Sequence, residues 1–140
     1  MPRMTIEDLD HFLRDHFPQA HGFGVVEEVA DDQIRMRLPF SPRSLRPGGT
    51  ISGPTLMALA DTAAYFLVLV NVGPVALAVT TSLNMTFLRR PAPADLIAVA
   101  RKLKLGRRLA VAEVYISRDG EPDPVAHAVV TYALPPDGAR

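Results

Sequence analysis

The feature that most constrains this chain is an apolar run from Leu56 to Val70 that also contains Asp61 and Thr62. The run is 15 residues long, whereas a membrane-spanning helix needs about 20 apolar residues with few charges. A helix of this composition is apolar on nearly every face, so other structure must surround it. The run therefore predicts a buried central helix.

Local signals place the ends of this helix and the elements around it. Ser52 can cap its N-terminus, Pro54 suits its first turn, and Asn71-Val72-Gly73-Pro74 ends it. Residues 39–54 are rich in Pro, Gly and Ser without periodicity, which is typical of a long functional loop. Other patterns predict a helix over residues 5–16 and strands over residues 23–30, 33–38, 77–88, 95–105, 109–117 and 125–134.

This order of elements predicts an α+β fold in which an antiparallel sheet curls around the central helix. Turn residues between the last four strands favour a meander. One sheet cannot cover a helix that is apolar all round, so we expect a homodimer or a bound apolar ligand to cover the rest. We expect one domain over residues 21–136, with a helix in residues 1–20 packed on it.

The net charge is zero, with 15 basic and 15 acidic residues, which argues against a nucleic-acid or membrane partner. The chain has no cysteine and no apolar leader, so we expect a cytoplasmic protein without disulfides or Cys-ligated metal. The charges are nevertheless segregated, since residues 33–108 hold eleven bases and two acids. This basic block indicates an anionic ligand or acid–base contacts within the fold, unless its charges form solvated faces.

Asp61 is the most informative residue, because a lone carboxylate within an apolar helix costs several kcal/mol unless it is paired or protonated. A desolvated carboxylate is a good candidate for a general base or a nucleophile. The alternative is a structural carboxylate that caps a neighbouring loop or pairs with an arginine.

Three segments carry a resemblance to a known family. Leu59-Ala60-Asp61 lies in the central helix, Leu83-Asn84-Met85-Thr86-Phe87-Leu88-Arg89-Arg90-Pro91 ends a strand, and residues 103–111 match a strand pair with a K-x-G-(K/R)-x-L-A turn. Together, in this order and spacing, they resemble the hotdog-fold thioesterases, and most closely their phenylacetate-pathway (PaaI-like) branch. The resemblance covers roughly residues 20–135 and implies a hotdog fold.

The resemblance also implies a mechanism. The Gly53 N–H at the start of the central helix would stabilise the oxyanion, because a helix N-terminus offers unpaired N–H groups and a positive dipole end. Asp61, implied to come from the opposite subunit, would activate water or attack the thioester carbonyl. Thr80 matches a position that orients the water in relatives, although it also suits a strand by propensity alone.

Two positions depart from the family pattern. Relatives have His-Gly-Gly where this chain has Ser52-Gly53-Pro54, and often have Asn where it has Arg46, while Gly49 is retained. Ser52 can cap the helix or hydrogen-bond the substrate. Pro54 removes one N–H from the helix N-terminus.

Basic residues that could bind the phosphates of coenzyme A cluster late in the basic block. With Arg46 and Gly49, the candidates for substrate binding are Arg89, Arg90, Arg107 and Arg108, of which the last two could instead form a solvated hairpin tip. Tyr65, one turn after Asp61, could hydrogen-bond Asp61 or line the acyl pocket, or it belongs to the core. No histidine spacing suits a metal, and no cofactor is expected beyond the coenzyme A part of the substrate.

We therefore expect an acyl-CoA thioesterase that acts on small or medium acyl or aryl thioesters. It would be a homodimer, and the family favours a dimer of dimers. A non-catalytic hotdog protein that binds acyl-CoA is the first alternative, because of the missing histidine. A hotdog enoyl-CoA hydratase is the second, although no histidine accompanies Asp61 in the expected spacing.

Overall fold

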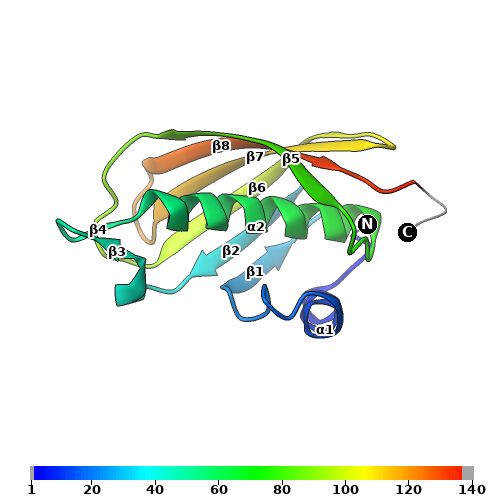
Figure 1. The fold of residues 1–140 in the computed structure, drawn as a ribbon, viewed down its shortest axis with the longest axis horizontal. Helices are drawn as coiled ribbons and strands as arrows, with labels where there is room; N and C mark the ends of the chain where they lie inside the picture. Colours follow the sequence, from blue (N-terminus) through cyan, green and yellow to red (C-terminus); the bar gives the residue numbers. More distant parts are fainter. Residues whose placement is uncertain (1, 137–140) are drawn as a thin grey trace.

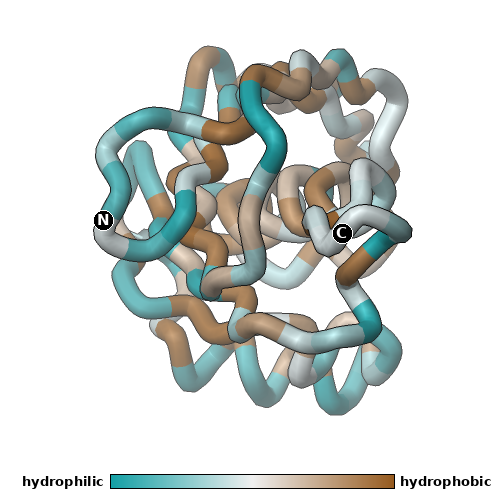
Figure 2. Tube along the Cα trace, turned by 90° about the vertical axis from the view of Figure 1, so that its left-hand side faces the viewer, coloured by the Kyte–Doolittle hydropathy of each residue, from teal (hydrophilic) through white to brown (hydrophobic). Residues whose placement is uncertain are grey.

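The predicted core helix is present as α2, Gly53–Val72, in the computed structural model, which describes residues 2–136 (Figure 1). Eleven of its residues between Leu56 and Val70 are buried. The helix ends at Gly73, whose N–H donates to the Leu69 carbonyl at 2.8 Å. Its length and composition would allow it to cross a membrane, but most of it is enclosed by the rest of the chain, as for a core helix. Figure 2 shows its largely apolar turns in the middle of the molecule.

An antiparallel sheet of six strands wraps one side of α2. In spatial order the strands are β1 (Val25–Val29), β2 (Gln33–Leu38), β6 (Leu96–Leu105), β7 (Leu109–Arg118), β8 (Pro124–Ala133) and β5 (Val79–Phe87). The predicted α+β class and the hotdog arrangement, a curled sheet around a central helix, are confirmed.

Small side chains on the inner face of the sheet let the helix approach closely. The inward positions of three central strands carry buried alanines, namely Ala98, Ala100, Ala112, Ala126 and Ala128. Bulky helix residues such as Leu59 and Leu69 are fully buried against this surface. Large residues on the helix and small ones on the sheet fill the space between the two layers, as close packing requires.

The predicted meander of the last four strands is wrong for its first member. Strands β6, β7 and β8 follow one another, but β5 lies at the sheet edge beside β8, with Thr80 opposite Tyr132. The chain must therefore cross the whole width of β8 and β7 between Phe87 and Leu96 to begin β6. Turn residues alone could not reveal this, because they show where a strand ends and not which strand it pairs with.

The segment over residues 39–54 is more ordered than its sequence predicts. It contains a short 3₁₀ turn, Pro42–Ser44, and a small hairpin made of β3 (Leu45–Arg46) and β4 (Thr50–Ile51). Gly48 and Gly49 form the turn of this hairpin with φ angles of 99° and 76°, a region that favours glycine. The first strand, Val25–Val29, is also shorter than predicted.

The predicted N-terminal helix is α1, Ile6–His16. Thr5 and Asp8 form a capping box at its start, in which each side chain accepts the backbone N–H of the other residue. Its apolar stripe, Leu9, Phe12 and Leu13, is buried, and the helix lies against β1 and α2. The division into residues 1–20 and 21–136 stays a prediction, and Met1 lies outside the described residues.

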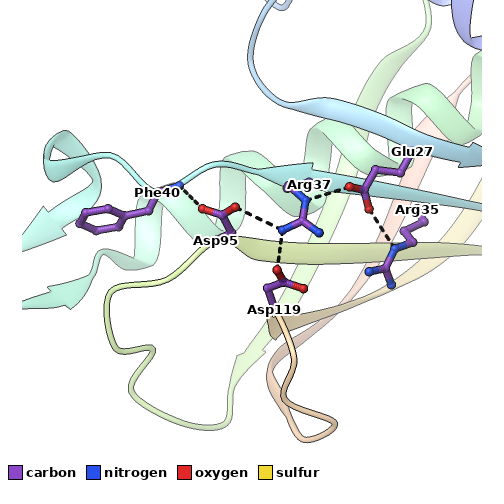
Figure 3. Close-up of polar contacts among 6 residues, drawn as sticks. All are labelled: Glu27, Arg35, Arg37, Phe40, Asp95 and Asp119. Carbon is purple, nitrogen blue, oxygen red and sulfur yellow. Dashed lines mark hydrogen bonds and ion pairs between the residues drawn. The ribbon is translucent and has the colours of Figure 1, made fainter.

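Part of the basic block is neutralised within the fold. On the outer face of β2, Arg37 contacts Glu27 at 2.8 Å, Asp95 at 3.2 Å and Asp119 at 2.7 Å, and Arg35 contacts Glu27 at 3.0 Å (Figure 3). These acids come from segments before, within and after the block. The acid–base contacts that the sequence allowed are therefore real for these two arginines.

Replacing Arg37 with methionine should lower the Tm by a few degrees at pH 7, because it leaves three neighbouring carboxylates without their shared cation. Hydrogen bonds from Arg37 hold the pKa values of Glu27 and Asp119 below their usual range. A carboxyl with a lowered pKa in the folded state contributes stability above its unfolded pKa and loses it as the pH falls.

The difference in Tm between wild type and Arg37→Met should therefore shrink as the pH is lowered below about 4. Thermal unfolding between pH 3 and 7 measures this, with Arg43→Met, an exposed arginine of the loop, as the control. A difference that stays constant over this range would show that the network does not stabilise the fold electrostatically.

Candidate active site

The N-terminus of α2 presents one unengaged backbone donor. Ser52 is the N-cap, and its hydroxyl oxygen accepts the Thr55 N–H at 3.3 Å, while its carbonyl accepts the Leu56 N–H at 3.3 Å. Pro54 has no N–H. Among the described residues nothing accepts the Gly53 N–H, so this group stays available to a ligand.

Two backbone hydrogen bonds hold the chain that leads into the helix. The Ile51 N–H donates to the Pro91 carbonyl at 3.0 Å, and the Ser52 N–H donates to the Ser44 carbonyl at 2.8 Å. The first of these ties the helix start to the crossover that follows β5. The position of Gly53 is therefore set by two loops that are distant in sequence.

A cavity of about 520 Å³ opens beside Gly53. Its walls include Phe87, whose ring lies 3.7 Å from where a Cβ on Gly53 would be, and the basic residues Arg46, Arg89 and Arg90. Three of the predicted substrate-binding arginines thus come together here, from β3 and from the crossover. Gly49 lies in the adjoining hairpin turn and does not line the cavity.

Arg107 and Arg108 do not join this group. They occupy the turn between β6 and β7, the yellow hairpin tip in Figure 1, at the opposite end of α2 from Gly53. The backbone carbonyl of Arg108 accepts the Leu134 N–H at 2.8 Å, which ties this tip to the end of β8. Within one chain these two residues are remote from the cavity at the helix N-terminus.

Asp61 lies two turns into α2 and is half-buried. Its Oδ1 accepts two hydrogen bonds of 2.7 Å, one from the Thr80 hydroxyl and one from the Tyr132 hydroxyl. The Tyr132 hydroxyl also lies 3.2 Å from the Asp61 backbone carbonyl. Among the described residues Oδ2 has no hydrogen-bond partner, so Oδ1 is fixed by two hydrogen bonds and Oδ2 is available to a ligand.

A carboxylate inside an apolar helix has to be paired or protonated, and the structure identifies the groups that pair with Asp61. Among residues 2–136, Asp61 neither caps a loop nor pairs with an arginine; it accepts two hydroxyl hydrogen bonds. Two neutral hydroxyl donors therefore supply the hydrogen bonds that a carboxylate inside an apolar helix needs.

Tyr132 is the site residue that the sequence did not reveal. Its side chain is buried, and it is the one large polar-tipped residue at an inward position of β8, among Ala126, Ala128 and Val130. Burial and then the charge of Asp61 raise its pKa well above the usual range, so the phenol stays protonated. The tyrosine at an inward, otherwise apolar position of this strand was the signal in the sequence that could have identified it. The sequence could not show that Tyr132 pairs with Thr80 across the sheet.

A second cavity, of about 280 Å³, adjoins Asp61, Thr80 and Tyr132. The rest of its wall is mostly apolar and comes from four segments, with Phe17, Ala20, Tyr65, Ala76, Ala78 and Val79 as the main contributors. Tyr65 is buried, its ring stacks on that of Tyr132 at 5.8 Å, and burial raises its pKa. Its hydroxyl has no hydrogen-bond partner among the described residues.

Within one chain, the cavity beside Gly53 and the cavity beside Asp61 are separate and share no lining residue. Gly53 and Asp61 are eight residues apart on the same helix, which corresponds to about 12 Å along its axis. A single carbonyl carbon cannot lie within reach of both groups. No group of three or more His, Asp or Glu residues within residues 2–136 could hold a metal ion.

Comparison with known proteins identifies the family. A family model described as the thioesterase superfamily matches residues 48–125, which include the helix N-terminus, Asp61 and Thr80. The chain belongs to the thioesterase superfamily. A candidate esterase of Halobacterium salinarum is 35% identical over 111 residues, which cover 72% of this chain and 73% of that protein.

Solved structures agree with this membership. A candidate thioesterase of Silicibacter sp. TM1040 is 43% identical and superposes with a TM-score of 0.88 over 97% of this chain and 95% of its own. A candidate thioesterase of Ralstonia eutropha related to phenylacetic acid degradation is 26% identical, with a TM-score of 0.76 over 84% of this chain and 90% of its own. The predicted resemblance to hotdog thioesterases of the PaaI-like branch is confirmed.

Removing the Ser52 N-cap of α2 should destabilise this thioesterase-superfamily protein. Ser52→Ala deletes the acceptor of the Thr55 N–H and should lower the free energy of unfolding by about 1 kcal/mol. Ser52→Asp, which keeps a capping oxygen, should retain most of that stability. Urea unfolding of the three proteins checks this, and an alanine variant as stable as wild type would show that the cap is not used.

Proposed function

We propose that the protein is an acyl-CoA thioesterase acting on small or medium acyl or aryl thioesters. The observation that carries the proposal is the asymmetric hydrogen bonding of the Asp61 carboxylate. Its Oδ1 accepts hydrogen bonds from two hydroxyls, whereas its Oδ2 has no partner among the described residues and lies beside a mostly apolar cavity. This arrangement supports a carboxylate that acts as a base or a nucleophile next to a bound acyl group.

In the proposed reaction the Gly53 N–H binds the thioester carbonyl oxygen as it becomes an oxyanion. Acting as a base, Asp61 Oδ2 takes a proton from water while the water oxygen bonds to the carbonyl carbon. The C–S bond then breaks, and the departing coenzyme A sulfur receives the proton. Acting as a nucleophile, Oδ2 itself bonds to the carbonyl carbon, and the C–S bond breaks as coenzyme A leaves as the thiolate, which takes a proton from water. Water then hydrolyses the resulting anhydride, which releases the carboxylic acid and restores the Asp61 carboxylate. Thr80 would orient the water.

The resemblance implies a histidine in relatives at the position of Ser52, whose hydroxyl caps the helix in this chain. In the proposed reaction its role is therefore to keep the Gly53 N–H directed at the substrate. The cap leaves the carbonyl site with one backbone donor, since Pro54 has no N–H and Thr55 is engaged.

The arginines beside Gly53 suit the phosphates of coenzyme A. Arg46, Arg89 and Arg90 line the larger cavity, and Gly49 lies beside it, so we propose that the nucleotide lies over this hairpin. Arg107 and Arg108 could reach the same nucleotide only from a neighbouring subunit, because they lie at the opposite end of α2.

The smaller cavity suits the acyl group. Its volume of about 280 Å³ exceeds the roughly 150 Å³ that is enough for benzene in a protein interior. Its walls are mostly alanine, valine and aromatic side chains, including Tyr65. We propose that an aryl group or a short to medium acyl chain occupies it, in line with the phenylacetic acid relationship named for the Ralstonia protein.

The site needs a second copy of the chain. Asp61 and Gly53 are too far apart in one protomer, so the partner's carboxylate would face the carbonyl bound by Gly53. A surface for such a partner surrounds the open edge strand β5, where Leu77, Val79, Phe87 and Leu88 are exposed. On α2, Met57 is 43% exposed and lies one turn before Asp61 on the same face. A partner that covers Met57 would also enclose Asp61.

Light scattering should therefore give a mass at least twice the 15.2 kDa of one chain at micromolar concentration. Met57→Asp should shift the mass towards the monomer and abolish thioesterase activity while the circular dichroism spectrum stays native. Ile6→Asp, at an equally exposed position of α1 (42%), is the matched control and should leave the assembly intact. A wild-type monomer would contradict the two-subunit site.

Hydrolysis is tested by thiol release over a panel of acyl-CoA and aryl-CoA thioesters. Asp61→Asn should lower kcat by about a hundredfold or more, because it removes the proton acceptor but keeps the shape. Asp15→Asn, on the exposed surface of α1, is the control. Unchanged turnover in Asp61→Asn would exclude Asp61 as the reactive group.

The same experiment addresses the alternative of a non-catalytic binding protein. That alternative predicts no thiol release from any thioester in the panel, together with a higher Tm in the presence of acyl-CoA. An enoyl-CoA hydratase would need a histidine beside the carboxylate, and no histidine of the described part of the chain lines the cavity at Asp61.

A further inference from the structure

Only one oxygen of the Asp61 carboxylate, Oδ1, accepts hydrogen bonds from described residues, and its two donors, Thr80 and Tyr132, lie in different parts of the sheet. Thr80 lies on β5, the open edge of the sheet, and it is exposed. Tyr132 lies on β8, an inner strand paired on both sides, opposite Thr80 on one side and Ala110 on the other. The Tyr132 donor is therefore the one fixed by the body of the sheet.

The ring of Tyr132 has little freedom. The residue is 4% exposed, and its ring stacks on Tyr65 with centroids 5.8 Å apart and planes inclined by 26°. Its hydroxyl reaches both the Asp61 Oδ1, at 2.7 Å, and the Asp61 backbone carbonyl, at 3.2 Å. The same hydroxyl thus contacts the helix backbone and the carboxylate it carries, which limits rotation of the Asp61 side chain.

The protonation state of Tyr132 suits this role. Burial and then the charge of Asp61 raise the pKa of Tyr132, so the phenol stays protonated and can donate. A hydrogen bond to an ionised acceptor is roughly twice as strong as one between neutral groups. The interaction therefore favours one orientation of the carboxylate.

We propose that Tyr132 is a positioning residue, whose hydroxyl fixes Asp61 Oδ1 and thereby leaves Oδ2 directed at the acyl group. This inference rests on the proposed thioesterase function and extends it to a residue that does not touch the reacting atoms. Tyr132 acts through Asp61, and Tyr65 supports it by stacking.

The test is Tyr132→Phe, which keeps the ring, its burial and its stacking on Tyr65 but removes the hydroxyl. We expect kcat to fall about tenfold or more, the loss that one hydrogen bond to a charged group accounts for, with KM changed less than about twofold. Tyr115→Phe on the outer face of the sheet makes the same chemical change away from both cavities and should leave kcat as in wild type.

A double-mutant cycle with Asp61→Asn separates positioning from general destabilisation. Because Tyr132 acts through the Asp61 carboxylate, Tyr132→Phe should cause no further loss of the residual rate once that carboxylate is gone. An equal loss in both backgrounds, a change confined to KM, or a wild-type kcat in Tyr132→Phe would each overturn the positioning role.

These outcomes are distinct from failure of the proposed function. If Asp61→Asn is inactive while Tyr132→Phe matches wild type, the thioesterase assignment stands and only the role of Tyr132 fails. If the wild-type protein releases no thiol from any thioester, both are overturned. Circular dichroism of each variant confirms that the rates compare folded proteins.

Discussion

Enclosure of the apolar helix α2 is the constraint on which the rest of the structure depends. Because the helix has no polar face, the sheet must curl around it, and alanines at the inward positions of β6, β7 and β8 allow the two to pack closely. One face stays partly open, where Met57 and Asp61 lie beside the edge strand β5. The part of the helix that the fold leaves uncovered is thus also the part that carries its single charge.

The position of β5 builds both halves of the site. Because β5 pairs with β8, Thr80 lies opposite Tyr132, and both hydroxyls reach Asp61 from the sheet. Because the chain must then cross to β6 at the other side of β7, the crossover passes the start of α2. That passage brings two arginines to Gly53 and ties the helix entry to the Pro91 carbonyl. The pairing of β5 with β8 at the edge of the sheet therefore creates both the Asp61 site and the basic cavity.

Some charged side chains of this protein join parts of the fold, and others surround the candidate site. Arg35 and Arg37 pair with acids from before, within and after the basic block, and these contacts join β1, β2, Asp95 before β6, and the β7–β8 turn. The arginines beside Gly53 lie around a cavity instead, where an anionic ligand could reach them. Asp61 differs from both groups, because its Oδ1 accepts hydrogen bonds from two neutral hydroxyls. A zero net charge conceals three different roles for charged side chains.

Local sequence determined most of the elements of this protein. The apolar run, the Ser52 cap and the alternating strands located the helices and strands closely, since periodicity and capping act over a few residues. Asp61 stood out because a carboxylate in such a run is costly. Only the tertiary structure decided that β5 lies beside β8, that Tyr132 holds Asp61, and that Arg107 and Arg108 lie away from the cavity. Strand pairing depends on contacts between distant segments, and no local pattern specifies which strands will meet.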